Sequence, residues 1–117
     1  MKALLILNDP PYGTERTYNG LRLAQTLLKS HPDGDIKVFL MADAVAAAKA
    51  NQKTPQGYYN VELMLKRILS GKGQVLLCGT CMDARGYGEA DLLEGARRST
   101  MDELAAATAA ADKVLVF

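Results

Sequence analysis

The sequence predicts an α/β fold, in which a mainly parallel β-sheet is covered by helices on both faces to give three layers. Short, continuous apolar runs, as expected of strands buried on both faces, alternate along the chain with segments of helical periodicity. The chain has 117 residues, of which 49% are hydrophobic and 23% charged, values that fit a globular domain with its own core. We therefore expect residues 1–117 to form a single domain.

The first strand is predicted at residues 3–7, a continuous apolar run. Proline, glycine and polar residues at 8–13 predict a loop after it. Thr14 is a candidate N-cap for the helix that follows, and Glu15 lies favourably near the positive end of that helix. The turn at 31–34 ends the helix, because a residue before proline leaves the helical region.

The middle of the chain predicts a second strand and two further helices. The strand is expected at 36–41, and an alanine-rich helix then opens at Asp43 and stops near Asn51. The stretch 52–59 is predicted to be irregular. A more strongly periodic helix follows and ends at Gly71. Its apolar residues have the i, i+3, i+4, i+7, i+8 spacing of a helix with one buried face: Val61, Met64, Leu65, Ile68 and Leu69.

The last part of the chain predicts three more strands and two helix starts. A third buried strand is expected at 74–77, and a Thr-x-x-Asp pattern at 80–83 indicates that a helix begins there. A loop rich in glycine and charge leads to a possible short strand at 96–99. A second capping box opens an alanine-rich helix over 100–111, and 114–117 is the closing strand.

Composition and charge exclude several classes of protein. The net charge is +1 and no basic face is visible, so we expect no direct binding to nucleic acid. The apolar run at the start is too short for a signal peptide, and no stretch approaches the ~20 apolar residues of a membrane span. We therefore expect a soluble, cytoplasmic protein that does not associate with membranes.

The two cysteines limit the chemistry that the chain can perform. Cys78 and Cys81 cannot build a disulfide framework, and with the single His31 they fall short of the four ligands of a structural zinc site. We accordingly expect neither a metal nor an organic cofactor. Thiol chemistry or inert burial remains.

Cys78 is the first candidate for a functional residue. It ends a predicted strand, and sites in open parallel sheets collect at the carboxyl ends of strands. The start of the following helix is expected to lower the pKa of the thiol, and Arg85 can add positive charge. Cys81 can either resolve an oxidised or sulfur-loaded Cys78 or face the core. The alternative for Cys78 itself is that it is a small, buried hydrophobic residue.

Two more residues and one loop complete the candidate pocket. Gly79 and Thr80 lie between the two cysteines. The loop after the first strand contributes Pro11, Tyr12 and Gly13, and it faces Cys78 if the first and third strands are neighbours. In that arrangement the tyrosine covers the thiol; the alternative is a rigid turn and helix cap. The sequence also predicts that the tyrosines at 58–59 anchor a loop or a subunit contact rather than bind a ligand.

Three segments together resemble the DsrE/DsrF-like family of small sulfur-relay proteins: residues 9–14, 77–86 and 111–117. The resemblance covers essentially the whole chain, and the cysteine segment is its most specific part. It implies a five-stranded parallel sheet between helix layers (a DsrEFH-like domain) and assembly into trimers or hexamers. Some members take persulfide sulfur on a cysteine that matches Cys78 and pass it on, in tRNA thiolation or sulfur oxidation. Cys81 is not shared by all the sulfur-relay members.

The resulting hypothesis is a sulfur carrier, similar to a sulfurtransferase, that accepts persulfide sulfur on Cys78 and passes it to a partner thiol. Its expected partners are further copies of the chain and sulfur donor and acceptor proteins. Two alternatives remain open. One is a non-catalytic oligomeric module that binds a small anion or nucleotide at the strand ends. The other is a redox protein that uses both Cys78 and Cys81.

Overall fold

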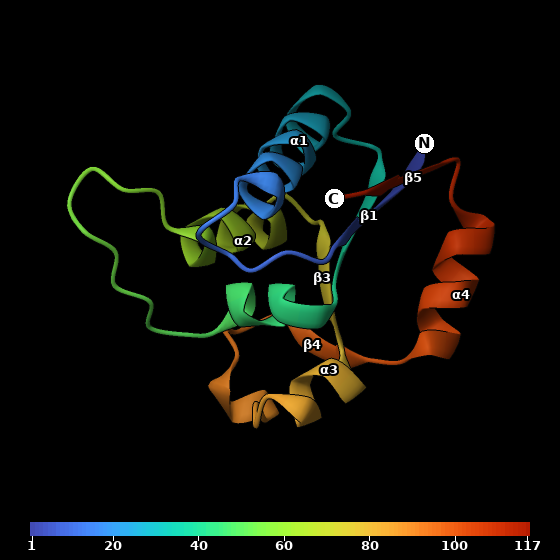
Figure 1. The fold of residues 1–117 in the computed structure, drawn as a ribbon. Coiled ribbons are helices and arrows are strands. Elements are labelled where there is room, and N and C mark those ends of the chain that lie inside the picture. The colour runs from blue at the N-terminus through green and yellow to red at the C-terminus, as the bar shows by residue number, and fades with distance from the viewer.

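The structure, a computed structural model that describes residues 1–117, contains one five-stranded parallel sheet in the order β4-β3-β2-β1-β5 (Figure 1). The strands are β1 Lys2–Leu7, β2 Asp35–Leu40, β3 Gln74–Cys78, β4 Arg97–Ser99 and β5 Lys113–Val116. The α-helices are α1 Arg16–Ser30, α2 Val61–Ser70, α3 Gly79–Ala84 and α4 Met101–Ala110, and the 3₁₀-helices are η1 Ala42–Ala48 and η2 Glu89–Asp91. The predicted fold class is confirmed.

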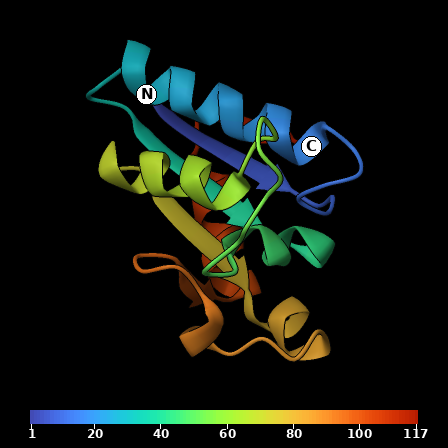
Figure 2. The ribbon, with the colours of Figure 1, turned by 90° about the vertical axis from the view of Figure 1, so that its left-hand side faces the viewer.

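Helices cover the two faces of the sheet unequally. In Figure 2, α1 and α2 lie in front of the sheet and α4 lies behind it. Successive residues of a strand point to opposite faces, so Leu5 joins the large core under α1 and α2, whereas Leu4 joins a small core under α4. The small core is completed by Phe39, Leu76, Cys78 and Leu104. None of the helices has both the length and the apolar character needed to cross a membrane.

The strand order brings four chain segments to one edge of the sheet. Leu7 pairs with Leu40, Leu40 pairs with Leu77, and Cys78 pairs with Ser99, so the carboxyl ends of β1 to β4 lie side by side. However, β2 lies between β1 and β3. The condition under which the loop after β1 would face Cys78, that β1 and β3 are neighbours, is therefore not met, because β2 pairs with both of them.

The helix starts follow the predicted capping patterns only in part. Thr100 caps α4 as predicted, since its hydroxyl accepts a hydrogen bond from the Glu103 N–H at 3.1 Å. Thr14 does not cap α1, because its hydroxyl instead donates to the Asp9 carboxylate. Helix α3 begins one residue before Thr80, and the expected alanine-rich helix after β2 is the 3₁₀-helix η1.

Candidate functional site

Cys78 is the last residue of β3 and lies in the small core under α4. The residues of β3 from 75 to 78 are buried, which fits a central strand of a parallel sheet. Alternation along the strand places Leu76 and Cys78 on the same face. Only 9% of the surface of Cys78 is exposed, so an attacking or leaving group can reach the thiol only from the strand end.

The backbone places the Cys78 sulfur at the start of α3. Cys78 is extended, with φ −60° and ψ 115°, and acts as the N-cap of this helix. Its Sγ accepts a hydrogen bond from the Cys81 N–H at 3.4 Å. This interaction takes the place of the Thr80 hydroxyl cap that the sequence pattern indicates.

Burial raises the pKa of the Cys78 thiol, and the neighbouring Cys81 thiol raises it further. The backbone N–H groups of Cys81 and Thr80 lower the pKa but do not outweigh burial and the Cys81 thiol together. The predicted lowering of the Cys78 pKa is therefore wrong for this chain. The physical reason is that removing the thiolate from water has a larger free-energy cost than the stabilisation it gains at the start of the six-residue helix α3.

The open side of Cys78 faces a pocket of about 420 Å³. Three segments form its walls: the end of β2, the junction of β3 with α3, and the junction of β4 with α4. The residues that line it are Met41, Cys78, Gly79, Thr80, Cys81, Arg98, Ser99, Thr100 and Met101. Both α3 and α4 begin at this pocket, so the positive ends of two helices face the same space.

Arg98 supplies the cation of the pocket. Its guanidinium lies over Gly79, where a Cβ atom would come within 2.7 Å of Nε, so the absence of a side chain admits the arginine. Arg98 also forms a bidentate ion pair with Asp83, in which its two terminal nitrogens donate to the two carboxylate oxygens at 2.7 and 2.8 Å. This pair lowers the pKa of the Asp83 carboxyl. The Arg98 cation is close enough to Cys78 for the two groups to interact electrostatically.

A polar cluster fixes the wall formed by β4 and α4. Arg97 binds the Glu103 carboxylate with two hydrogen bonds, at 2.9 and 2.6 Å, and the Ser99 hydroxyl donates to the same group. These partners lower the pKa of Glu103 to about 2. With the Thr100 cap, they tie the first turn of α4 to the end of β4.

The structure brings together only part of the predicted site. Gly79, Thr80 and Cys81 line the pocket with Cys78 as expected. Arg85 does not, because its guanidinium turns toward η1 and pairs with Asp43 at 2.8 Å, while also donating to the Cys81 carbonyl.

The loop with Pro11, Tyr12 and Gly13 is also absent from the pocket lining. The Tyr12 hydroxyl donates to Gln52 at 2.8 Å, and its ring lies 5.4 Å from that of Tyr59. The interposed strand β2 separates this loop from the end of β3, so Tyr12 does not cover the thiol.

Five lining residues were not predicted from the sequence: Met41, Arg98, Ser99, Thr100 and Met101. Each of them lies in the last two residues of a strand that the sequence does predict, directly follows such a strand, or begins the next helix. The strand-end rule finds them once the order of the strands is known. The structure contains no group of three or more His, Cys, Asp or Glu side chains placed to share a metal ion.

Comparison with known proteins gives relatives along the full chain. Protein YchN of Escherichia coli K12 is 41% identical over 116 residues, which is 99% of this chain and 98% of YchN. An uncharacterized protein of Methanocaldococcus jannaschii is 38% identical over 117 residues and covers 100% of both chains.

Solved structures agree with the sequence relationships. The crystal structure of the E. coli ychN protein superposes with a TM-score of 0.95 at 41% identity, covering 99% of this chain and 98% of that one. A protein of unknown function from Methanobacterium thermoautotrophicum shares the fold, with a TM-score of 0.78 at 14% identity and coverage of 99% and 97%. The family model of the DsrE/DsrF-like family matches residues 1–117. The chain therefore belongs to the DsrE/DsrF-like family, which is associated with sulfur metabolism.

Proposed function

We propose that the protein is a sulfur carrier that accepts persulfide sulfur on Cys78 and passes it to a partner thiol. The observation that carries this proposal is the position of the thiol, at a strand end whose open side meets a pocket with one arginine and two helix starts. Membership in a family associated with sulfur metabolism supports the same chemistry.

The transfer step needs no external oxidant or reductant. The Cys78 thiolate attacks the terminal sulfur of a donor persulfide, a new S–S bond forms on Cys78, and the donor's own S–S bond breaks. The donor leaves as a thiolate, and the transferred sulfur keeps its proton or loses it to solvent. A second thiolate then attacks the outer sulfur of loaded Cys78, which returns Cys78 to the thiolate.

The pocket assigns separate tasks to its residues. Because the pKa of Cys78 is raised, a small thiolate fraction exists at neutral pH, and the reaction depends on holding the donor close to the sulfur. Arg98 and the N–H groups at the start of α3 favour the anionic form of the sulfur.

A dithiol redox reaction is the second candidate, and the placement of Cys81 favours it. Its N–H group bonds to the Cys78 sulfur at 3.4 Å, and its thiol is near enough to raise the Cys78 pKa. Attack of the Cys81 thiolate on loaded Cys78 would form a disulfide and release hydrosulfide. In the carrier reaction, this step limits the lifetime of the loaded form.

Intact-mass measurement after exposure to a low-molecular-weight persulfide donor tests the proposal. The natural chain is expected to gain one sulfur atom, and Cys78→Ser to gain none. Cys81→Ser serves as the matched control; it keeps the uptake and holds the sulfur longer. Uptake by Cys78→Ser together with loss in Cys81→Ser reverses the assignment, and uptake by both variants rejects the carrier function. A product that has lost two hydrogen atoms and carries no added sulfur, as expected for a Cys78–Cys81 disulfide formed with release of hydrosulfide, supports the redox reaction instead.

We also propose that the chain works as a homo-oligomer, a trimer or a hexamer. Three apolar side chains are exposed on the α4 side of the molecule: Met101 at 62%, Val116 at 65% and Val114 at 40%. The valines belong to β5, an edge strand, and the methionine lines the Cys78 pocket. Covering this surface with a neighbouring copy removes apolar side chains and an open strand edge from water.

A further inference from the structure

A second pocket, of about 350 Å³, lies between α1, the segment that precedes α2, and α2 itself. It shares no residue with the Cys78 pocket. Tyrosine rings form one wall, contributed by Tyr18 of α1 and by Tyr58 and Tyr59 of the segment. Arginines approach from both helices, Arg22 from α1 and Arg67 from α2.

The tyrosine rings of the pocket form a stacked row. The centroids of Tyr18 and Tyr59 lie 4.2 Å apart with the planes 28° from parallel, and those of Tyr58 and Tyr59 lie 4.7 Å apart at 19°. Tyr58 ends the row of parallel rings; the Tyr12 ring packs against it at a tilt of 42°, with the centroids 5.7 Å apart, and Tyr58 is still 49% exposed. A further planar ring can extend the row by stacking, which is the favoured geometry for aromatic pairs.

The charge of the pocket is positive. Arg67 forms no ion pair and donates no side-chain hydrogen bond, and Arg22 donates only to Asn19 while lying 5.5 Å over the Tyr18 ring. No aspartate or glutamate lines the pocket. Burial, with Tyr58 and Glu15 nearby, raises the pKa of Tyr59 to about 12, so this phenol adds no negative charge at neutral pH.

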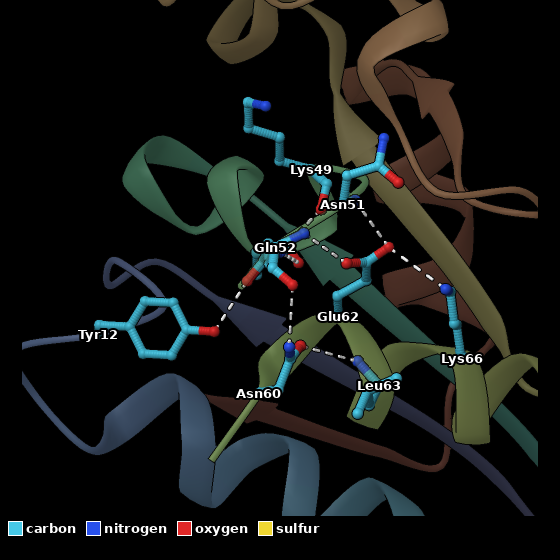
Figure 3. A network of polar contacts seen from close by, with 9 residues as sticks. Tyr12, Lys49, Asn51, Gln52, Asn60, Glu62, Leu63 and Lys66 are labelled. Atoms are coloured by element: carbon cyan, nitrogen blue, oxygen red, sulfur yellow. Dashed lines mark hydrogen bonds and ion pairs between the residues drawn. The ribbon is translucent and has the colours of Figure 1, made fainter. Parts of the chain in front are cut away.

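The segment with the tyrosines is anchored at its base (Figure 3). Buried Glu62 accepts hydrogen bonds from the N–H groups of Asn51 and Gln52, at 3.1 and 2.8 Å. The Tyr12 hydroxyl donates to the Gln52 side chain at 2.8 Å and accepts from the Val61 N–H at 3.2 Å. The tyrosine wall is thus held in place before any ligand arrives, which reduces the ordering cost of binding.

We infer that this pocket binds a nucleoside monophosphate, a planar aromatic ring that carries an anionic group. The base stacks on Tyr58 and the phosphate pairs with Arg22 and Arg67, which matches one ligand group to each wall. A volume of about 350 Å³ is at the small end of the range for ligand pockets, so it fits one nucleotide rather than a dinucleotide. The sequence predicted only an anchoring role for Tyr58 and Tyr59; the unpaired arginines across the pocket add the ligand role.

Calorimetric titration of the full chain with AMP tests this site, with adenosine and inorganic phosphate titrated separately. We expect AMP to bind about tenfold or more tightly than either part, because only AMP can both stack on the tyrosine and pair with the arginines. Tyr58→Ala and Arg67→Gln, both at exposed positions, are each expected to weaken AMP binding about tenfold.

Arg16→Gln is the matched control, because it removes the same charge from a side chain of α1 that is 73% exposed and does not line the pocket. It should leave the AMP affinity unchanged. The inference is overturned if AMP does not bind at millimolar concentration, if phosphate alone binds as well as AMP, or if Arg16→Gln weakens binding as much as Arg67→Gln. None of these outcomes bears on sulfur uptake by Cys78, which is measured separately by intact mass.

Discussion

Two opposing effects act on the Cys78 thiol, and their balance decides how it reacts. Burial under α4 disfavours the thiolate, and the Cys81 thiol adds to this effect. The N–H groups of Cys81 and Thr80 and the Arg98 cation favour it. Burial is the larger effect, so the resting thiol is mainly protonated at neutral pH. Because little thiolate is present, we expect such a cysteine to react slowly with free electrophiles and faster with a partner that binds beside it.

The first prediction concerns the pH dependence of Cys78 alkylation. In Cys81→Ser, where Cys78 is the single cysteine, the alkylation rate should rise with pH and reach half its maximum above the ~8.5 of a free thiol. Arg98→Gln should move this midpoint further upward, because it removes the cation that favours the thiolate. A pH–rate profile with iodoacetamide measures both. A midpoint below ~8.5 in Cys81→Ser contradicts the prediction.

The sequence was sufficient to place Cys78 but not to find Arg98. A cysteine that ends an apolar run marks a strand end without knowledge of its neighbours. Arg98 reaches the pocket because β4 pairs with β3 and because Gly79 leaves room for a guanidinium. Both facts depend on contacts between segments far apart in the chain. Arg85 lies nearer to Cys78 in sequence, yet Asp43 holds it elsewhere.

Individual elements were predicted well where a local pattern determines them. The α2 helix has a buried stripe and a cap, and Thr100 has a glutamate three residues later, so both helix starts follow from nearby residues. The start of α3 was misplaced because a sulfur atom took the capping role of the Thr80 hydroxyl. The order of the strands has no local pattern, so the sequence left open whether the first and third strands are neighbours, and the structure shows that they are not.

The second prediction concerns the junction of β4 and α4. Glu103→Gln should lower the melting temperature at neutral pH, because it removes the carboxylate that binds Arg97 and Ser99. Arg97 and Ser99 lower the pKa of Glu103 to about 2, so its contribution is complete above the unfolded value of ~4.3 and is lost as the pH falls toward 2. The difference between variant and natural chain should therefore shrink between pH 4 and pH 2.

Asp102→Asn is the control for this measurement, since Asp102 lies in the same first turn but forms no ion pair. Thermal unfolding at several pH values records both variants. An equal loss of stability in Asp102→Asn would show that general helix-end charge, and not the Arg97 pair, is responsible.

The third prediction concerns the anchor before α2. Glu62 is 5% exposed, and although burial alone would raise its pKa, the N–H groups of Gln52 and Asn51 and the Lys66 cation lower it overall. Glu62→Gln should reduce the free energy of unfolding by about 1–3 kcal/mol, because the buried acceptor of the Asn51 and Gln52 N–H groups loses its negative charge. Hydrogen exchange at the Asn51 and Gln52 amides should accelerate. Glu94→Gln, at an exposed position without an ion pair, should change neither quantity.

At the scale of the whole molecule, the two faces of the sheet differ in how completely they are covered. The large core lies under α1 and α2, whereas α4 alone covers the other face. Of the residues of α4, Leu104 is the one that is buried. Val114 and Val116 pair with Leu4 and Ile6, so they lie on the α4 side at the sheet edge. This face presents both the edge strand and the mouth of the Cys78 pocket.

The last prediction is that this face holds copies of the chain together. Light scattering at micromolar concentration should give a trimer or hexamer for the natural chain, and Val116→Asp should shift it toward monomer. Val116 is 65% exposed, so an aspartate there costs little stability in the isolated fold but places a charge in an apolar contact.

Leu63→Asp is the matched control. Leu63 is 48% exposed in the opposite helix layer, so this variant should leave the assembly intact. A monomeric natural chain contradicts the prediction, and dissociation by Leu63→Asp instead of Val116→Asp moves the interface to the α1–α2 layer.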